Sequence, residues 1–372
     1  MNQKKSKFHT LKEFYQLYTS GLSRDEVERL LKRESLDVLS YYKRGAVSKN
    51  SAEDNFPKRQ LLVVKEIFLS FVLKLTPARR LFYGMAVILF IFALFISNLF
   101  YGLIAFLILN LLLAFELADK MVSKDELEIA RNIQLGLQPE KNPEIKGLEI
   151  AVFYQPAREV GGDYYDFIQL DDHRIALIVG DVSGKGMPAA LYAVRLQGLF
   201  ELLAKNQASP KQMLVRINDV IAQRLKKNYF ITAVIAIFDT KEKKLHLARA
   251  GHNPPIYFKS ATKEIVWLKP SGIGIGLNKS SNFDNEMSEK SIDISEGDLF
   301  LFYTDGITEA RNGLKVEFGE ERLGKIVAEE AHLSAEEFKD KLVTQLNHFV
   351  KKAFWEDDAT IVVIKAGEVM SL

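Results

Sequence analysis

Cysteine is absent from this chain of 372 residues. Its absence excludes disulfide frameworks, thiolate metal sites and cysteine nucleophiles. Histidine is scarce, with 6 residues, so a metal ion would be held chiefly by carboxylate oxygens, which favour hard divalent cations. Neither sign of charge is in excess, because 50 Lys and Arg face 48 Asp and Glu. We therefore expect no nucleic-acid partner.

The most conspicuous feature that is present is a long apolar run. Between Leu81 and Leu117 the only charged residue is Glu116. A bilayer core takes roughly 20 apolar residues per helix, so the run predicts two transmembrane helices, 81–97 and 99–117. A hairpin buried inside a soluble domain is the alternative interpretation.

Positive charges on both sides of this run predict its orientation. Basic residues flank the hairpin and occur at the start of the chain, at Lys4, Lys5, Lys7, Arg79, Arg80, Lys120 and Lys124. The positive-inside rule then places both termini in the cytoplasm, on a protein of the cytoplasmic (inner) membrane. Because the first residues are polar, we expect no cleavable signal peptide.

The apolar run also sets the expected domain limits. Residues 1–78 form a helical cytoplasmic region of unknown role, and 79–120 form the two membrane helices. Within the first region, residues 61–75 predict a helix that either lies on the membrane surface or packs as an ordinary globular helix.

A linker helix is expected at 121–146. Ser123 and Glu126 form a capping box, and apolar residues follow at helical spacing until Gly136 to Pro139 end the helix. The apolar stripe could pair two copies as a short coiled coil, which gives a possible homodimer, or it could pack on its own catalytic domain.

From residue 147 to 367 the pattern changes to short alternating segments typical of strands. We expect strands at 148–154, 174–180, 229–238, 244–250, 255–258, 264–268, 298–303 and 360–364, and helices at 187–205, 210–227, 320–331 and 334–352. Short polar links between strands indicate antiparallel hairpins and disfavour a doubly wound parallel sheet. The expected class is α+β, an antiparallel β-sandwich flanked by helices.

Aspartates stand at the ends of several expected strands. Asp163, Asp181 and Asp305 lie beside glycine, and the pair Asp357 and Asp358 opens the last expected strand. A single Asp-Gly is usually a turn, but four such positions could converge into an oxygen-only site for two Mg2+ or Mn2+ ions. We expect the neighbouring glycines to let a metal or phosphate approach the backbone.

Five segments carry a specific resemblance. They are 159–166 (EVGGDYYD), 180–186 (GDVSGKG), 250–255 (AGHNPP), 303–309 (YTDGITE) and 357–360 (DDAT). Their order resembles the PPM-type metal-dependent protein serine/threonine phosphatases, in the bacterial branch of the sporulation stage II protein E and the stress-response sigma-regulator phosphatases. The resemblance spans about residues 127 to 366.

The resemblance implies a β-sandwich with two Mn2+ or Mg2+ ions and a phosphorylated regulatory protein as substrate, such as an anti-sigma-factor antagonist in a partner-switching pathway. Asp163 would contact one metal, Asp181 would bridge both beside the Val182 carbonyl, and Asp305 and Asp357 would complete the site. Asp358 is an alternative ligand, or an acceptor that holds water.

Other residues near the motifs have two interpretations each. His252 could protonate the leaving group or fix a loop by a hydrogen bond. Arg158 and Lys185 could bind phosphate or be solvated charges. Better-known eukaryotic members carry a histidine where Val182 and Ser183 stand here, so no general acid is assigned.

Two other functions compete with this interpretation. A catalytically inactive phosphatase-fold scaffold would be expected to have lost a metal-binding acid. A nucleotide cyclase would have an acid after Asp163, whereas Tyr164 is there. Regulation is expected to pass through the linker helix, which would carry a signal read by the first 120 residues to the metal site.

Overall fold

The computed structural model describes residues 56–96, 98–136, 138–139, 141–206, 208–277, 282–350 and 355–367. The helical character expected of residues 1 to 55 lies outside these ranges. The chain divides into two compact units, Met1–Met121 and Val122–Leu372.

The described part of the first unit is helical. Helix α4 (Phe56–Lys74) is followed by α5 (Pro77–Ile96) and by the first part of α6 (Leu99–Gly136). Both α5 and α6 are long and apolar enough to cross a membrane. Most of their apolar side chains face outward; Phe95 and Leu99 are 85% and 89% exposed. The hairpin is therefore not the buried core of a soluble domain within the described residues.

The expected break before the linker helix is absent. The capping box at Ser123 predicted a new helix, but α6 runs from Leu99 to Gly136 without interruption. Residues 118–122 contain neither glycine nor proline, so nothing ends the first helix there. The predicted end at Gly136 is confirmed.

The second unit contains two antiparallel sheets of five strands. One has the order β1-β10-β9-β6-β7 and the other β2-β3-β4-β5-β8. The strands are β1 (Leu148–Gln155), β2 (Tyr164–Gln169), β3 (Arg174–Val182), β4 (Ile231–Asp239), β5 (Lys244–Ala250), β6 (Ile256–Lys259), β7 (Glu264–Trp267), β8 (Glu289–Asp293), β9 (Leu299–Tyr303) and β10 (Ala359–Ala366).

Successive side chains along a strand point to opposite faces of its sheet, and this alternation divides the apolar residues into three clusters. On β9, Phe300 and Phe302 point into the cluster between the sheets, whereas Leu301 points to the helices outside. On β3, Leu177 likewise faces the other sheet and Ile178 faces the helices. Strands buried on both faces explain why these segments are apolar throughout, and the expected helix-flanked sandwich is confirmed.

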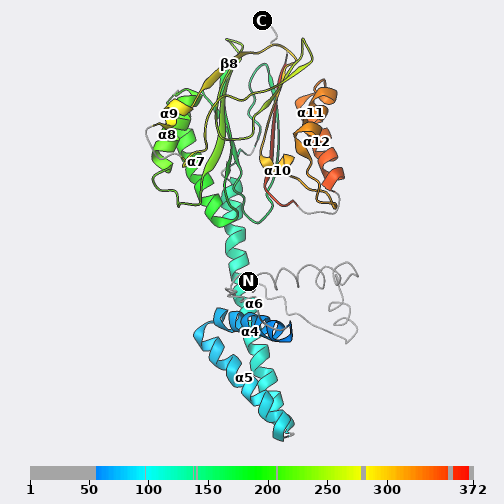
Figure 1. Cartoon of the computed structure of the whole chain (residues 1–372). Helices are drawn as coiled ribbons and strands as arrows, with labels where there is room; N and C mark the ends of the chain where they lie inside the picture. The colour runs from blue at the N-terminus through cyan, green and yellow to red at the C-terminus, as the bar shows by residue number, and fades with distance from the viewer. Residues whose placement is uncertain are drawn as a thin grey trace, which may run out of the picture. The chain divides into compact units, whose positions relative to one another are not determined.

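Helices cover the outer face of each sheet (Figure 1). On one side are α7 (Met187–Lys205), α8 (Pro210–Ile221) and the short α9 (Phe283–Glu286); on the other are α10 (Asp305–Thr308), α11 (Gly319–Glu330) and α12 (Ala335–Val350). Helix α8 begins with a capping box, in which Ser209 accepts a hydrogen bond from the Gln212 backbone. It ends at Ile221, earlier than the predicted residue 227.

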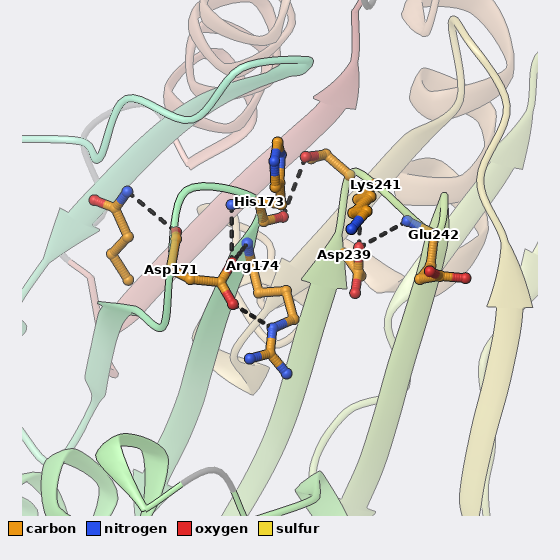
Figure 2. A network of polar contacts seen from close by, with 8 residues as sticks. Asp171, His173, Arg174, Asp239, Lys241 and Glu242 are labelled. Carbon is orange, nitrogen blue, oxygen red and sulfur yellow. Dashed lines mark hydrogen bonds and ion pairs between the residues drawn. The ribbon is translucent and has the colours of Figure 1, made fainter.

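At one end of the second sheet, two hairpin turns are held by aspartates (Figure 2). Asp171 accepts hydrogen bonds from the backbone of His173 and Arg174 and pairs with the Arg174 guanidinium at 2.6 Å. Asp239 accepts from the backbone of Lys241 and Glu242. These side-chain contacts fix the β2–β3 and β4–β5 turns. The acidic motifs lie at the opposite ends of β2 and β3.

Candidate active site

Strand register brings two of the predicted acids together. In the β2–β3 pair, Tyr164 lies opposite Gly180. Asp163 directly precedes Tyr164, and Asp181 directly follows Gly180. The two aspartates therefore meet at one end of the second sheet, although 17 positions of hairpin separate Asp163 from Gly180 in the sequence.

Asp163 also joins the two sheets. Its Oδ2 atom accepts hydrogen bonds from the hydroxyl groups of Thr304 at 2.7 Å and Thr360 at 2.6 Å. Thr304 follows β9 and Thr360 lies in β10, so both donors belong to the first sheet. The Thr360 backbone N–H in turn donates to the Thr304 hydroxyl at 3.0 Å. These buried bonds fix the Asp163 carboxylate where the two sheets meet.

Asp305 and Asp357 complete a group of acids that interact electrostatically. Asp305 is the first residue of α10, immediately after Thr304, and Asp357 lies just before β10. Burial, together with the charges of Asp305, Asp357 and Asp358, raises the pKa of the Asp181 carboxyl to about 7. Burial also raises the pKa of Asp305 to about 6, with contributions from Glu309 and Asp357.

Burial and neighbouring negative charge also raise the pKa of Asp163. Burial raises the pKa of its carboxyl well above the ordinary value, and the charge of Asp181 adds to the rise. Carboxylates that repel one another in a buried place are stabilised by a divalent cation, so the donor set fits the metal ions that the resemblance implies. Within the described ranges, no three acidic or histidine side chains already form a coordination shell. Metal binding would therefore have to draw the carboxylates together.

Asp357 and Asp358 have different surroundings. Asp358 is 6% exposed, and its two carboxylate oxygens accept the backbone N–H groups of Ala157 at 2.8 Å and Gly162 at 2.6 Å. Asp357 is more open, and its Oδ2 atom pairs with the Lys185 ammonium at 2.8 Å. Asp358 thus holds the loop that carries Asp163. Asp357 instead pairs with the Lys185 ammonium.

The glycines of the motifs serve packing. A Cβ on Gly162 would lie 2.8 Å from the Val182 carbonyl oxygen, and one on Gly306 would lie 1.9 Å from the Asp358 carbonyl oxygen. Neighbouring backbone therefore explains the need for glycine at these two positions. The approach of a metal or phosphate to this backbone stays a prediction.

His252, Arg158 and Lys185, the other predicted site residues, differ in burial and in the groups that they contact. His252 is 2% exposed, and its Nδ1 atom lies 2.9 Å from the Thr232 hydroxyl. Burial lowers the pKa of His252 to about 3, so its ring is neutral at pH 7 and is a poor proton donor. Arg158 is exposed in the bend before Asp163. Lys185 is bonded to Asp357 and to the Glu356 carbonyl oxygen.

A polar cavity of about 220 Å³ adjoins this group of acids. Lys185, Gly306, Arg311 and Asp357 contribute to its lining, together with Glu309, Ala310 and Glu356. Arg311 is held by Glu317 at 2.7 Å. Sequence reasoning missed Arg311, because an arginine in a polar loop shows no pattern that distinguishes it from a solvated charge.

Sequence reasoning also missed Gln134, near the end of α6. Its side-chain amide donates to the Gly161 carbonyl oxygen at 2.8 Å and accepts from the Gly161 N–H at 3.2 Å. The side chain is only 9% exposed. The end of the linker helix is thus bonded to the Gly161–Gly162 loop, next to Asp163. The sequence alone could not single out this glutamine, because its role depends on the loop that it contacts.

Replacing Gly306 with alanine should destabilise the second unit by about 1–3 kcal/mol or more, because the added methyl group overlaps the Asp358 carbonyl. Gly313→Ala is the matched control: nothing lies within 4 Å of a Cβ there, and its effect should stay within about 0.5 kcal/mol. Urea unfolding measures both. Equal stability of the two variants would contradict the packing argument.

A metal-induced rise in Tm should grow with pH. Because the folded-state pKa values of Asp163, Asp181 and Asp305 are raised, the folded protein binds more protons than the unfolded chain between about pH 4 and pH 7. These groups therefore favour folding at low pH, and their contribution is lost as pH rises through about 6 to 7. Mg2+ or Mn2+ binds the deprotonated form, so we expect a larger increase in Tm at pH 8 than at pH 5.5.

Differential scanning fluorimetry with and without metal checks this dependence. Asp305→Asn removes one ionising group and should reduce the difference between the two pH values. Equal metal-induced shifts at pH 5.5 and pH 8 in the unsubstituted protein would show that these carboxyls do not hold the ion.

Comparison with known proteins shows which family this chain matches. A family model described as Stage II sporulation protein E (SpoIIE) matches residues 171–367, more than half of the chain. The match includes Asp181, Asp305 and Asp357 and begins after Asp163.

Curated relatives agree with the family model. The phosphoserine phosphatase RsbU of Bacillus subtilis (strain 168) is 30% identical over 244 residues, which cover 65% of this chain and 70% of RsbU. The phosphoserine phosphatase RsbP of the same organism is 25% identical over 252 residues, which cover 66% of this chain and 59% of RsbP.

Solved structures support the fold. The SiaA-PP2C domain of Pseudomonas aeruginosa has a TM-score of 0.59 at 22% identity and covers 67% of this chain and 98% of that domain. The PP2C phosphatase domain of SpoIIE from Bacillus subtilis, with a fragment of its regulatory domain, has a TM-score of 0.51 at 19% identity and covers 60% of this chain and 64% of that one. The predicted family is confirmed, and the chain belongs to the SpoIIE family of PP2C-type (PPM) phosphatases.

Proposed function

We propose that this chain is a membrane-anchored, metal-dependent phosphatase that hydrolyses phosphoserine or phosphothreonine on a small regulatory protein. The observation that carries the proposal is the meeting of Asp163, Asp181, Asp305 and Asp357 beside a polar cavity. The names of RsbU and RsbP, both phosphoserine phosphatases, support the same reaction. The resemblance favours an anti-sigma-factor antagonist of a partner-switching pathway as substrate.

The chain's own residues have distinct roles in this proposal. Asp181 is the central carboxylate, since its ionisation is coupled to Asp305 and Asp357 as well as to Asp163, and the Val182 carbonyl supplies a further oxygen beside it. Two bound Mn2+ or Mg2+ ions would supply an activated water and neutralise charge on the phosphoryl oxygens. Asp358 holds the Gly162 backbone and so keeps Asp163 in place.

The polar cavity suits the phosphorylated side chain. Lys185 and Arg311 both line it and carry the positive charge that phosphoryl oxygens require. Both are paired with acids, so a substrate would compete for them. Arg158 is exposed near the same loop and is a further candidate for substrate contact. We assign His252 to loop positioning, through its bond to Thr232.

Membrane anchoring through α5 and α6 belongs to the proposal. The two helices are long and apolar enough to span a bilayer, and the basic residues around them place both termini and the phosphatase domain on the cytoplasmic side. A homodimer through α6 is supported by Ile129 and Ile133, which are each 60% exposed on the linker part of the helix. Leu127 and Ala130, on the neighbouring face, are half-buried.

Metal-dependent phosphate release tests the reaction. The full-length protein in detergent, with p-nitrophenyl phosphate or a phosphoserine peptide, should need Mn2+ or Mg2+ for activity. Asp181→Asn and Asp305→Asn should each lower kcat/KM by more than about 100-fold, beyond the effect of substitutions outside the coordination shell. Asp171→Asn is the control at the opposite end of the sheet (Figure 2) and should remain active.

Activity that persists without divalent metal, or in both site variants, would exclude the proposed centre. Complete inactivity of the full-length protein in detergent and in lipid, with no metal binding, would favour the inactive scaffold instead.

The linker helix is the proposed route of regulation. Gln134 bonds the end of α6 to Gly161, and Gly162 is bonded to Asp358. A displacement of α6 would therefore act directly on the loop that carries Asp163. The state of the first unit would reach the metal site through this contact.

Removing residues 1–122 should change the Mn2+ concentration that gives half-maximal activity. In a Gln134→Ala background the same truncation should have an effect of less than about twofold, because the two changes act through one contact. The exposed neighbour Asn132 provides the control: Asn132→Ala should leave the effect of truncation intact. Identical activity, metal dependence and oligomeric state with and without residues 1–122 would contradict the route.

A further inference from the structure

Helix α4 runs across the direction of the α5–α6 hairpin instead of extending it (Figure 1). The two helices α4 and α5 are separated only by Leu75 and Thr76. The family match covers residues 171–367 and so does not include α4. The proposed phosphatase reaction therefore assigns no role to this helix. Its position is nevertheless fixed by specific contacts.

An arginine of α5 fixes the end of α4. The Arg80 guanidinium donates to the carbonyl oxygens of Val72 at 3.1 Å, Leu73 at 2.9 Å and Leu75 at 3.1 Å. These carbonyls lie in the last turn of α4 and just after it, where intrahelical N–H donors run out; the Val72 oxygen also accepts the Leu75 N–H at 3.2 Å. Three bonds from one planar group hold the turn between α4 and α5 at a defined angle.

Aromatic contacts hold the body of α4 against α5. The ring of Tyr83 lies edge-on to Phe71, with centroids 5.5 Å apart, and tilted to Phe68 at 6.4 Å. The side of α4 that carries Phe71 thus packs on the hairpin. The helix can rotate about its axis only by breaking these contacts.

The exposed side of α4 is only partly apolar, because Lys65 and Lys74 are exposed together with its apolar residues. Leu69 and Leu73, one helical turn apart, are 50% and 56% exposed, and Phe68 beside them is 50% exposed. The neighbouring stripe of the helix, Glu66, Ser70 and Lys74, is polar. Residues four apart share a face, so α4 has an apolar stripe and a polar stripe side by side.

Charged residues mark the level at which α4 lies. Arg79, one residue before the Arg80 clamp, pairs with Glu116 at 2.9 Å and with Asp119 at 2.7 Å on α6. Such charges are costly in a bilayer core and belong at its boundary with water. A helix that crosses the hairpin at this level runs along the membrane surface.

We propose that α4 is an interfacial helix that inserts Leu69 and Leu73 into the lipid surface of the cytoplasmic leaflet. This inference rests on the proposed anchoring of α5 and α6 in the membrane. The lipid surface is continuous with the bilayer that surrounds the hairpin, which is why it is the occupant of the apolar stripe. Lys65 lies on the same stripe, and its ammonium group can reach anionic headgroups while its carbon chain lies along the lipid.

The absence of cysteine allows a direct test. Single substitutions Leu69→Cys, Leu73→Cys, Ser70→Cys and Lys74→Cys in the full-length protein can each carry one nitroxide spin label. The protein is placed in nanodiscs of phosphatidylethanolamine and phosphatidylglycerol, and collisions with dissolved oxygen and with a water-soluble nickel chelate are measured. Ile88→Cys, in the apolar middle of α5 and 67% exposed, is the reference for the bilayer core.

Labels at 69 and 73 should collide mainly with oxygen, at a depth of about 5–10 Å below the headgroups. Labels at 70 and 74 should collide mainly with nickel, and the label at 88 should be reached by oxygen alone. The contrast between adjacent positions is the expected signature, because a helix in bulk water or wholly within lipid would show none.

Three other results would overturn the inference. Nickel access at 69 and 73 equal to that at 70 and 74, with 88 in lipid, would remove α4 from the membrane and leave the anchoring intact. Nickel access at 88 would refute the anchoring itself, and the role of α4 with it. Shielding of 69 and 73 from both probes would show that protein covers the stripe, either residues 1–55 or a second copy of the chain.

Discussion

The mutual repulsion of buried carboxylates is the constraint on which this domain depends. Asp163, Asp181 and Asp305 stand in a place where burial and neighbouring negative charge raise their pKa values. No single element could hold them there, because each acid lies at the end of a different strand. The sandwich supplies the counteracting bonds, with two threonine hydroxyls on Asp163 and two backbone N–H groups on Asp358. The fold thus stabilises an arrangement that a divalent cation would stabilise further.

The same bonds connect the centre to the rest of the chain. Thr304 and Thr360 couple the two sheets, and because Thr304 directly precedes Asp305, their bonds hold Asp163 close to Asp305. Gly161 and Gly162 lie between Asp358 on one side and Gln134 on the other. A single loop is therefore bonded both to Asp358, beside the group of acids, and to the end of α6. In this account the linker helix acts on catalysis through loop geometry and needs no contact with the substrate.

Much of the fold was predicted from the pattern of apolar residues along the chain. The elements that were not predicted have physical explanations. Strands such as β3 and β10 are apolar on both faces and were predicted within about two residues. β2 was missed because Asp166 interrupts its apolar residues; its carboxylate is satisfied locally by the Tyr164 hydroxyl and the Phe167 N–H. β8 was missed because it is a mostly exposed edge strand without alternation. The capping box at Ser123 was a local signal overridden by continuous helix on both sides.

The sequence predicted which acids lie near one another, but not their contacts. Five motifs in order pointed to these acids, yet the different surroundings of Asp357 and Asp358 depend on partners about 200 residues away in sequence. Gln134 and Arg311 left no signal, because their importance comes from the loops that they contact. Spacing along the chain identifies residues that converge at strand ends. It does not identify those that position them.

Anomalous diffraction at the manganese edge tests the central claim most directly. Crystals of the protein, or of residues 122–372, would be soaked in Mn2+ and the anomalous peaks located. We predict two peaks, roughly 3.5–4 Å apart, with the Asp181 carboxylate between them and Asp163, Asp305 and Asp357 around them. No peak at these aspartates, with Mn2+ bound elsewhere or not at all, would contradict the assignment of the buried carboxylates as a metal centre.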